Sequence, residues 1–218
     1  KPAAGRHSIA SMLPSLPTPG DALVAALIEV EHAGAAFLPW LDAATTEFFL
    51  RSCDDLAYRV ARPLVGGAGR EVRQDFELTM DIPPGHALRQ VASALTELTL
   101  AALARLTPNP LPEGLVFNDL IVQRYAAGSA GITPHRDHIR YVGLVALLTL
   151  AGDARFFLCD DRAGSAPREF GMAPGGITLM RAPGFPGEPQ RPFHCVSGIR
   201  QPRVSLGLRH DTRPGEPT

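Results

Sequence analysis

Two residues with metal-ligand side chains stand two positions apart in the stretch GITPHRDHIRY, residues 131–141. They are His135 and Asp137, and the apolar run VGLVALLTL follows them. If this region is a strand, side chains two positions apart point to the same face, so both would converge while Arg136 points away. The pair therefore predicts half of a metal site. A polar turn between two strands is the alternative, because a His-x-Asp pair alone is common by chance.

A metal site needs a third ligand, and His194 offers one in RPFHCVSGI, which we expect to be the penultimate strand. The remaining histidines lie in the lead-in, on or beside helical segments, at a position facing away, or at the end of the last strand: His7, His32, His86, His138 and His210. Two histidines and one carboxylate on one side of an iron leave three coordination positions open, which is the ligand set of non-haem Fe(II) oxygenases. A histidine that merely packs in the core or lies on the surface is the alternative for His194.

A strand near the end of the chain carries two arginines on one face. In RVSLGLR, alternation places Arg203, Ser205, Gly207 and Arg209 on one side and apolar residues on the other. A guanidinium is costly to bury unless an anion meets it, and small residues between two of them leave room for a ligand. We therefore expect an anionic small molecule beside the metal, with Arg203 and Ser205 in its binding site. Arg209 could instead point to solvent past the strand end.

Another expected strand, FNDLIVQRY, supplies matching polar groups, because Gln123 and Tyr125 share a face. A tyrosine hydroxyl in a buried sheet usually has a polar partner. The segment AAGSAG between this strand and His135 is a permissive turn. Gln123 and Tyr125 are therefore two further candidate ligand-binding residues.

The elements that must position these residues differ between the two parts of the chain. Helical apolar spacing occurs in three segments, residues 22–34, 43–61 and 85–106. Asp21 and Asp42 are placed to cap the first two helices. Stop signals follow the three segments at Gly34, Pro63 and Pro108. The intervening residues 35–41 and 70–82 are expected to be extended.

From residue 115 the pattern changes to short apolar runs separated by Gly, Pro and Asp, which is typical of an antiparallel sandwich or barrel. The sequence therefore predicts a mainly β protein with flanking helices (α+β). We expect four parts: a flexible lead-in at 1–20, helical support with a short lid region at 21–114, a jelly-roll catalytic core at 115–212, and a tail at 213–218. The support and the core are expected to form one fused domain.

Composition excludes several classes of protein. A chain of 218 residues, 45% hydrophobic and 20% charged, is ordinary for a globular protein with one sizeable core. Its longest apolar runs, of about ten residues, are far too short to cross a membrane. A formal net charge of −1 gives no general attraction to nucleic acid. The three cysteines, Cys53, Cys159 and Cys195, lack metal-type spacing and cannot all pair, which favours a reducing cytoplasm.

Taken in order, the motifs resemble the Fe(II)/2-oxoglutarate-dependent dioxygenases, and within them the AlkB-like group. The matching elements are QRYAAGSAGITPHRD, GGITLMRAP, FHCVSG and RVSLGLR with its Arg-x5-Arg spacing, over residues 115–211. The resemblance implies a double-stranded β-helix (jelly roll) core supported by N-terminal helices. It also implies an enzyme that uses Fe(II), 2-oxoglutarate and O2 to hydroxylate or oxidatively dealkylate a C–H bond, releasing succinate and CO2.

The resemblance also implies roles for single residues. The implied metal ligands are His135, Asp137 and His194. Arg203 would pair with the distal carboxylate of 2-oxoglutarate, and Arg209 would lie near its metal-bound end. Tyr125 would assist as a hydrogen-bond donor, whereas Gln123 stands where the family typically has Asn. Two other classes stay open: a non-oxygenase metal-binding jelly roll, which would not need two inward arginines, and a β-rich interaction module, which would leave the three ligands scattered.

Departures from the AlkB-like pattern bear on the substrate. Repair enzymes of that group usually carry an acidic residue two positions after the metal-binding aspartate, where this chain has Ile139. Their lid bears aromatic residues, whereas Phe76 is the sole aromatic of residues 62–84. Base flipping needs a stacking platform and phosphate contacts. The sequence therefore favours a small molecule or metabolite over nucleic acid, although three arginines of this segment could contact phosphates: Arg62, Arg70 and Arg73. A protein side chain is the third option.

Overall fold

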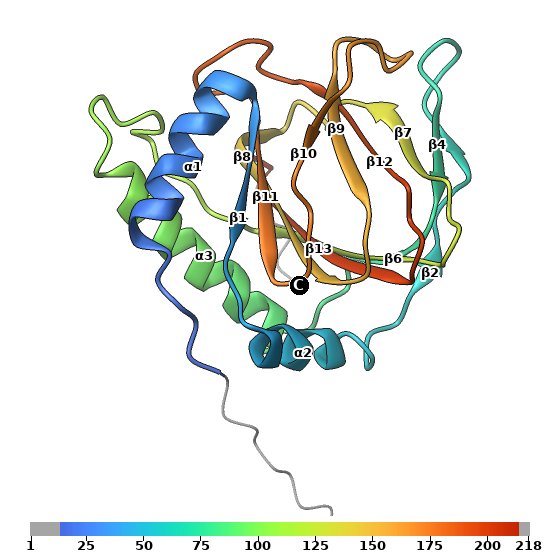
Figure 1. Ribbon diagram of the computed structural model, residues 1–218, viewed down its shortest axis with the longest axis horizontal. Coiled ribbons are helices and arrows are strands. Elements are labelled where there is room, and N and C mark those ends of the chain that lie inside the picture. The colour runs from blue at the N-terminus through green and yellow to red at the C-terminus, as the bar shows by residue number, and fades with distance from the viewer. Residues whose placement is uncertain (1–13, 214–218) are drawn as a thin grey trace, which may run out of the picture.

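The computed structural model describes residues 14–213, so His7, most of the expected lead-in and nearly all of the expected tail lie outside the described residues. Two antiparallel sheets face each other, and three helices cover the outer face of the larger sheet (Figure 1). The helices are α1 (Gly20–Ala33), α2 (Ala43–Ser52) and α3 (Ala87–Leu103). Within the described part of the chain, no helix is long and apolar enough to cross a membrane. The predicted fold class, mainly β with flanking helices, is confirmed.

The larger sheet has seven strands in the order β1-β11-β8-β13-β6-β5-β2. Their bounds are β1 (Ala35–Pro39), β11 (Gly176–Arg181), β8 (Tyr141–Ala151), β13 (Arg203–Asp211), β6 (Asp119–Tyr125), β5 (Glu77–Thr79) and β2 (Arg59–Val60). The interior strand β8 is apolar on both faces, because Leu144 and Leu148 pack toward the helices while Val145 packs between the sheets. Burial on both faces explains its continuous apolar run.

The smaller sheet has six strands in the order β10-β9-β12-β7-β4-β3. Their bounds are β10 (Arg168–Phe170), β9 (Arg155–Cys159), β12 (Phe193–Ser197), β7 (Gly131–His135), β4 (Val72–Asp75) and β3 (Leu64–Val65). Residues 62–84, expected to be a short lid, supply three of the paired strands: β3 and β4 in this sheet and β5 in the larger one. This segment therefore contributes strands to both sheets.

Two expectations about the helices are wrong in detail. Asp42 caps α2 as predicted, its carboxylate accepting from the Thr45 amide at 2.7 Å, but Asp21 lies within the first turn of α1 and pairs with Arg105. The second helix ends at Ser52 and not near residue 61. A turn follows, in which the Tyr58 hydroxyl donates to the Cys53 carbonyl at 2.9 Å, and the next residues pair with β5 as strand β2. Pairing with a sheet overrides the helical spacing there.

Candidate metal centre

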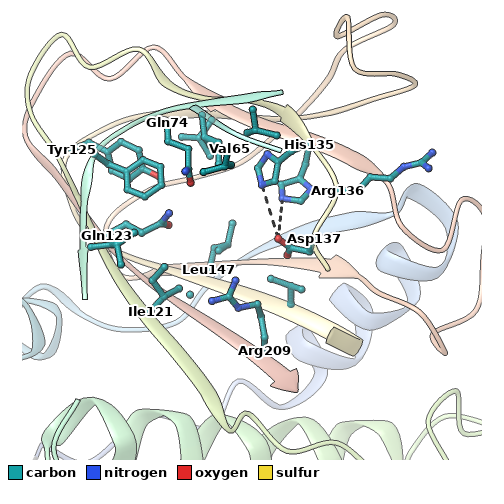
Figure 2. A pocket seen from close by; sticks show the side chains of 18 residues that line it. Val65, Gln74, Ile121, Gln123, Tyr125, His135, Arg136, Asp137, Leu147 and Arg209 are labelled. Carbon is teal, nitrogen blue, oxygen red and sulfur yellow. Dashed lines mark ion pairs between the residues drawn. The ribbon is translucent and has the colours of Figure 1, made fainter. Parts of the chain in front are cut away.

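A cavity of about 270 Å³ lies between the two sheets (Figure 2). On one side it is lined by His135, Asp137 and His194 from the smaller sheet and its loops. On the other side Gln123, Tyr125 and Arg209 face it from the larger sheet. Six of the predicted residues, from four separate motifs, therefore meet around one cavity, whereas Arg203 and Ser205 are not among its lining residues.

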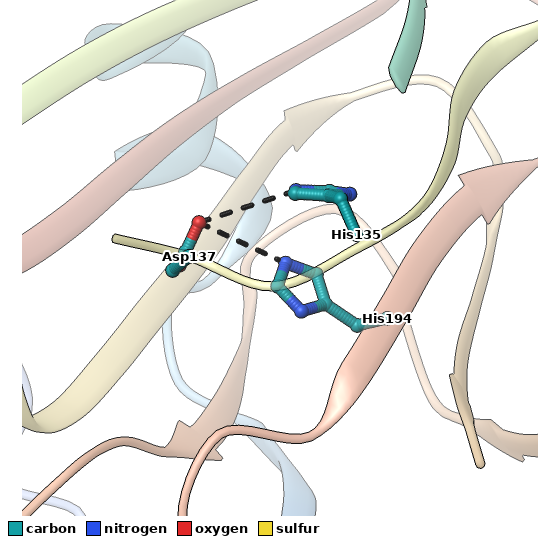
Figure 3. Close-up of side chains that lie close together, drawn as sticks. All are labelled: His135, Asp137 and His194. Carbon is teal, nitrogen blue, oxygen red and sulfur yellow. Dashed lines mark ion pairs between the residues drawn. The ribbon is translucent and has the colours of Figure 1, made fainter. Parts of the chain in front are cut away.

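The three predicted metal ligands lie together at one end of this cavity (Figure 3). His135, the last residue of β7, is the direct cross-strand partner of His194 on β12, and the ring centroids are 4.2 Å apart. The Asp137 Oδ1 atom is 4.0 Å from His135 Nε2 and 3.9 Å from His194 Nε2. One ligand atom from each residue lies within 4.8 Å of the other two. Three groups at this spacing can share one metal ion.

The reason for the convergence differs from the one the sequence suggested. Strand β7 ends at His135, so Asp137 lies in the turn that follows and not on the same strand face. The turn toward β8 is closed by the Tyr141 amide, which donates to the His138 carbonyl at 3.0 Å. The Arg136 side chain does extend away from His135 and Asp137, as expected (Figure 2), and its guanidinium lies 4.1 Å from the centre of the Phe193 ring. The turn geometry, and not the alternation of a strand, brings Asp137 back toward the histidines.

Hydrogen bonds orient both imidazoles toward the shared space. The His135 Nδ1 atom lies 2.9 Å from the Thr133 carbonyl oxygen, and His194 Nδ1 lies 3.3 Å from the Pro192 carbonyl oxygen. A carbonyl can only accept, so each Nδ1 carries the proton and each Nε2 keeps its lone pair for a metal. Backbone carbonyls that fix ligand histidines in this way are typical of metal sites.

The electrostatics of the cluster favour the protonation states that bind metal. Burial, together with the neighbouring His194, lowers the pKa of His135 to about 4. Burial alone would raise the pKa of Asp137, but the neighbouring His194 and the Arg209 guanidinium outweigh it and lower that pKa. His135 is therefore neutral and Asp137 ionised at neutral pH, as metal ligation requires.

Arg203 is buried without an acidic partner. Its side chain lies at the start of β13 with 1% of the residue exposed, and no carboxylate of residues 14–213 lies within ion-pair distance of it. Nη1 donates to the Ser205 hydroxyl at 2.9 Å, Nη2 lies 3.2 Å from the Met172 sulfur, and Nε has no hydrogen-bond partner among the described residues. The guanidinium carbon lies 5.0 Å from the centre of the Tyr125 ring. A buried cation that lacks an anion is costly, which indicates a binding site for an anionic ligand.

Arg209 has a different environment. It lines the cavity, and its Nη2 atom lies 2.8 Å from Asp119 Oδ2, although without the in-line geometry of a hydrogen bond. Its guanidinium also stacks on the Tyr141 ring at 4.4 Å. Only 14% of its side chain is exposed, so the alternative, that Arg209 points to bulk solvent, is wrong. Asp119 was not among the predicted site residues, because its role depends on strand register, which makes it the cross-strand partner of Arg209.

The positions of the remaining predicted cofactor-binding residues are set by the same pairing of β6 with β13. Tyr125 pairs with Arg203, and Gln123 with Ser205, across β6 and β13. Tyr125 packs on Phe76 with ring centroids 5.0 Å apart, and these two rings line both the first cavity and a neighbouring one of about 440 Å³ that Arg203 borders. The Arg203 guanidinium therefore lies against the Tyr125 ring and lines the neighbouring cavity, not the one that the metal ligands line.

The strands of residues 62–84 close the remaining side of the cavity. Val65, Val72 and Gln74 of β3 and β4 line it, together with Phe76 (Figure 2). The Gln74 side-chain nitrogen donates to the Arg62 carbonyl at 3.0 Å, so its carbonyl oxygen stays available toward the cavity. Gln74 was not among the predicted site residues, because a single glutamine in a short alternating strand carries no functional signal.

No protein-family model and no curated protein sequence matches the chain. Among solved structures, it is similar to a 2-oxoglutarate–Fe(II) oxygenase family oxidoreductase from Burkholderia pseudomallei (14% identity, 88% of this chain and 92% of that one, TM-score 0.61). It is also similar to a prolyl-4-hydroxylase from Pseudomonas putida (19% identity, 88% and 100%, TM-score 0.58) and to OsALKBH1 (17% identity, 81% and 98%, TM-score 0.52). The chain therefore has the fold of the 2-oxoglutarate–Fe(II) oxygenases. The AlkB-like group is one of several groups that share it.

Proposed function

We propose that this protein is an Fe(II)- and 2-oxoglutarate-dependent dioxygenase. It would hydroxylate or oxidatively dealkylate a C–H bond of an organic substrate while 2-oxoglutarate is converted to succinate and CO2. The observation that carries the proposal is Arg203, a buried guanidinium without a carboxylate partner among residues 14–213, in a fold that also holds a two-histidine, one-aspartate cluster. A metal-binding jelly roll of another kind would gain nothing from burying that charge.

The donor set fits a ferrous ion. Two imidazole nitrogens and one carboxylate on one side of the metal suit non-haem Fe(II) and leave open positions for a chelating cosubstrate. His135, Asp137 and His194 would hold the ion, which when bound supplies the redox chemistry toward O2. The protein supplies position and exclusion of water, because apolar side chains of both sheets enclose the ligands.

The cosubstrate would lie between the metal ligands and strand β13. Arg203 would pair with its distal carboxylate, and the Tyr125 hydroxyl would donate a hydrogen bond to the same group. Ser205, which already accepts from Arg203, would keep the guanidinium in place. Gln123 lines the cavity between the two ends, and Arg209 would lie near the metal-bound end. These roles would use the polar groups of β6 and β13 that line the cavity, together with Arg203 and Ser205 beside it.

An anaerobic titration tests the proposal. Fe(II) and 2-oxoglutarate together should give a weak visible charge-transfer band with the intact protein, and His194→Ala should abolish it. His32→Ala is the matched control, because His32 is exposed on α1 and lies outside the cluster. Absence of the band in the intact protein, or its persistence in His194→Ala, would contradict the assignment.

We further propose a small molecule or metabolite as substrate. The wall formed by residues 62–84 offers aliphatic side chains and one amide, and Phe76 is buried against Tyr125, so it cannot stack on a base. Ile139 is exposed where an acidic base contact would be expected. Nucleic acid is the second candidate, because one structural neighbour is OsALKBH1 and three arginines of this segment lie exposed: Arg62, Arg70 and Arg73.

Substrate-dependent succinate release separates these candidates. Metabolite pools, methylated oligonucleotides and proline-containing peptides should be tested side by side; the peptides are included because another neighbour is a prolyl-4-hydroxylase. Stimulation by oligonucleotides alone would overturn the small-molecule proposal.

All three cysteines are free thiols in the structure, which supports our proposal of a reducing, cytoplasmic setting.

A further inference from the structure

We propose that Arg191 is a positioning residue for the metal centre, and that its guanidinium fixes Asp137 by binding the backbone carbonyl of that residue. This inference rests on the proposed function. It concerns a residue that lies outside the ligand cluster and outside the cavity lining.

Asp137 is the ligand with the weakest support of its own. His135 and His194 each belong to a strand and each have an Nδ1 atom close to a backbone carbonyl oxygen. Asp137 lies beyond the end of β7, and within residues 14–213 no hydrogen bond reaches its carboxylate. Among residues 14–213, its ion-pair contacts are with the two imidazoles, which would turn toward the metal. The position of the carboxylate therefore depends on how its backbone is held.

Arg191 provides that support with two hydrogen bonds to one atom. Its Nε donates to the Asp137 carbonyl oxygen at 3.1 Å, and its Nη2 donates to the same oxygen. A carbonyl oxygen has two lone pairs and can accept both, and bonds from a charged donor are about twice as strong as neutral ones. The side chain is half-buried and forms no ion pair with a carboxylate of the described residues. Its hydrogen-bonding capacity is therefore directed at the metal-ligand turn.

The contact connects two ligands that are far apart in sequence. Arg191 lies three positions before His194, at the end of the loop between β11 and β12. The start of that loop is held by Arg181, which is 2% exposed and donates to the carbonyl oxygens of Glu31 and Glu188, each at 3.1 Å. The bond to Glu188 holds the chain three residues before Arg191, and β12 begins two residues after it, so Arg191 has a defined position. The turn that carries Asp137 is thereby tied to the segment that leads into His194.

Metal binding tests the inference without relying on turnover. Co(II) is titrated into the metal-free protein and its d–d absorption is recorded, with chemical denaturation run in parallel. Arg191→Met should weaken Co(II) binding by about tenfold and alter the d–d spectrum, as expected when an outer-shell partner of a ligand is lost. Arg191→Lys, which can donate but lacks the planar fork, should bind with intermediate affinity. The metal-free stability should fall by less than the metal-bound stability.

Arg168→Met is the matched control. The Arg168 guanidinium also donates to a backbone carbonyl, that of Ala33 at 3.0 Å, but its side chain is exposed and the contact lies away from the ligands. This variant should bind Co(II) as the parent does. If the parent protein binds no Co(II), the proposed function fails and this inference fails with it. If the parent binds and Arg191→Met binds equally well with the same spectrum, the inference alone is overturned. Should Arg191→Met not fold, parent-like affinity in Arg191→Lys would overturn it and weakened affinity would support it.

Discussion

Replacing Arg203 with methionine should separate ligand binding from stability. Methionine fills much of the same space without a charge, so Arg203→Met removes a guanidinium that is 1% exposed and has no anion among the described residues. Burial lowers the pKa of Arg203, and only Tyr125 counteracts this, which marks the site as unfavourable for the cation when no ligand is bound. Replacement of buried charges by apolar residues is often neutral or stabilising by about 1–4 kcal/mol. We therefore expect ligand-free Arg203→Met to be at least as stable as the parent.

The same substitution should weaken the binding of 2-oxoglutarate, although it does not reduce the stability of the ligand-free protein. Truncating one partner of a buried, hydrogen-bonded charge pair costs about 2–5 kcal/mol, and a middle value of about 3 kcal/mol corresponds to about 150-fold weaker binding. At a 2-oxoglutarate concentration about 100 times the parent Kd, the ligand stabilises the parent by about 2.7 kcal/mol. With a Kd about 150-fold higher, the same concentration stabilises the variant by only about 0.3 kcal/mol.

Chemical denaturation with Mn(II) replacing Fe(II), with and without 2-oxoglutarate, measures both quantities. Arg200→Met is the control, because Arg200 is an exposed arginine on the loop before β13, paired with Asp153; it should leave the 2-oxoglutarate effect unchanged. Our reasoning is refuted if Arg203→Met keeps the full stabilisation by 2-oxoglutarate. It is also refuted if the ligand-free variant loses several kcal/mol, because the guanidinium would then be a structural group.

Two further predictions concern the charges around the cluster. The pKa of His135, about 4, lies below its ordinary 6.5, so the unfolded chain takes up the proton first as the pH falls. The metal-free protein should therefore lose up to about 3 kcal/mol between pH 6.5 and 4; urea unfolding at both ends of this range measures the loss, and an equally steep profile in His135→Gln would contradict the assignment. Asp119→Ala should cost about 3 kcal/mol, because it leaves the mostly buried Arg209 unpaired. Denaturation of Asp119→Ala and of the double variant with Arg209→Met tests this, since a coupled pair requires the double variant to recover much of the loss.

Local patterns in the sequence predicted the helices and strands of this fold better than they predicted which residues contact one another. Alternation and apolar runs identified the strands that carry Gln123, Tyr125, His194 and Arg203, because burial on a sheet face is recorded along a single strand. The spacing around α3 identified that helix for the same reason. The types of side chain alone were sufficient to suggest a metal site beside an anion site.

Tertiary structure decided which of these groups meet and which stay unpaired. Asp137 faces the histidines because a turn beyond β7 directs it there, and Arg209 is paired because register sets it opposite Asp119. Arg203 stays without an anionic partner, since the described fold places no acidic side chain within ion-pair distance of it. Each of these facts depends on contacts between segments far apart in the chain. Periodicity reports how deeply a residue is buried, whereas the partner it meets is set by strand register and loop anchoring, which no single segment of sequence contains.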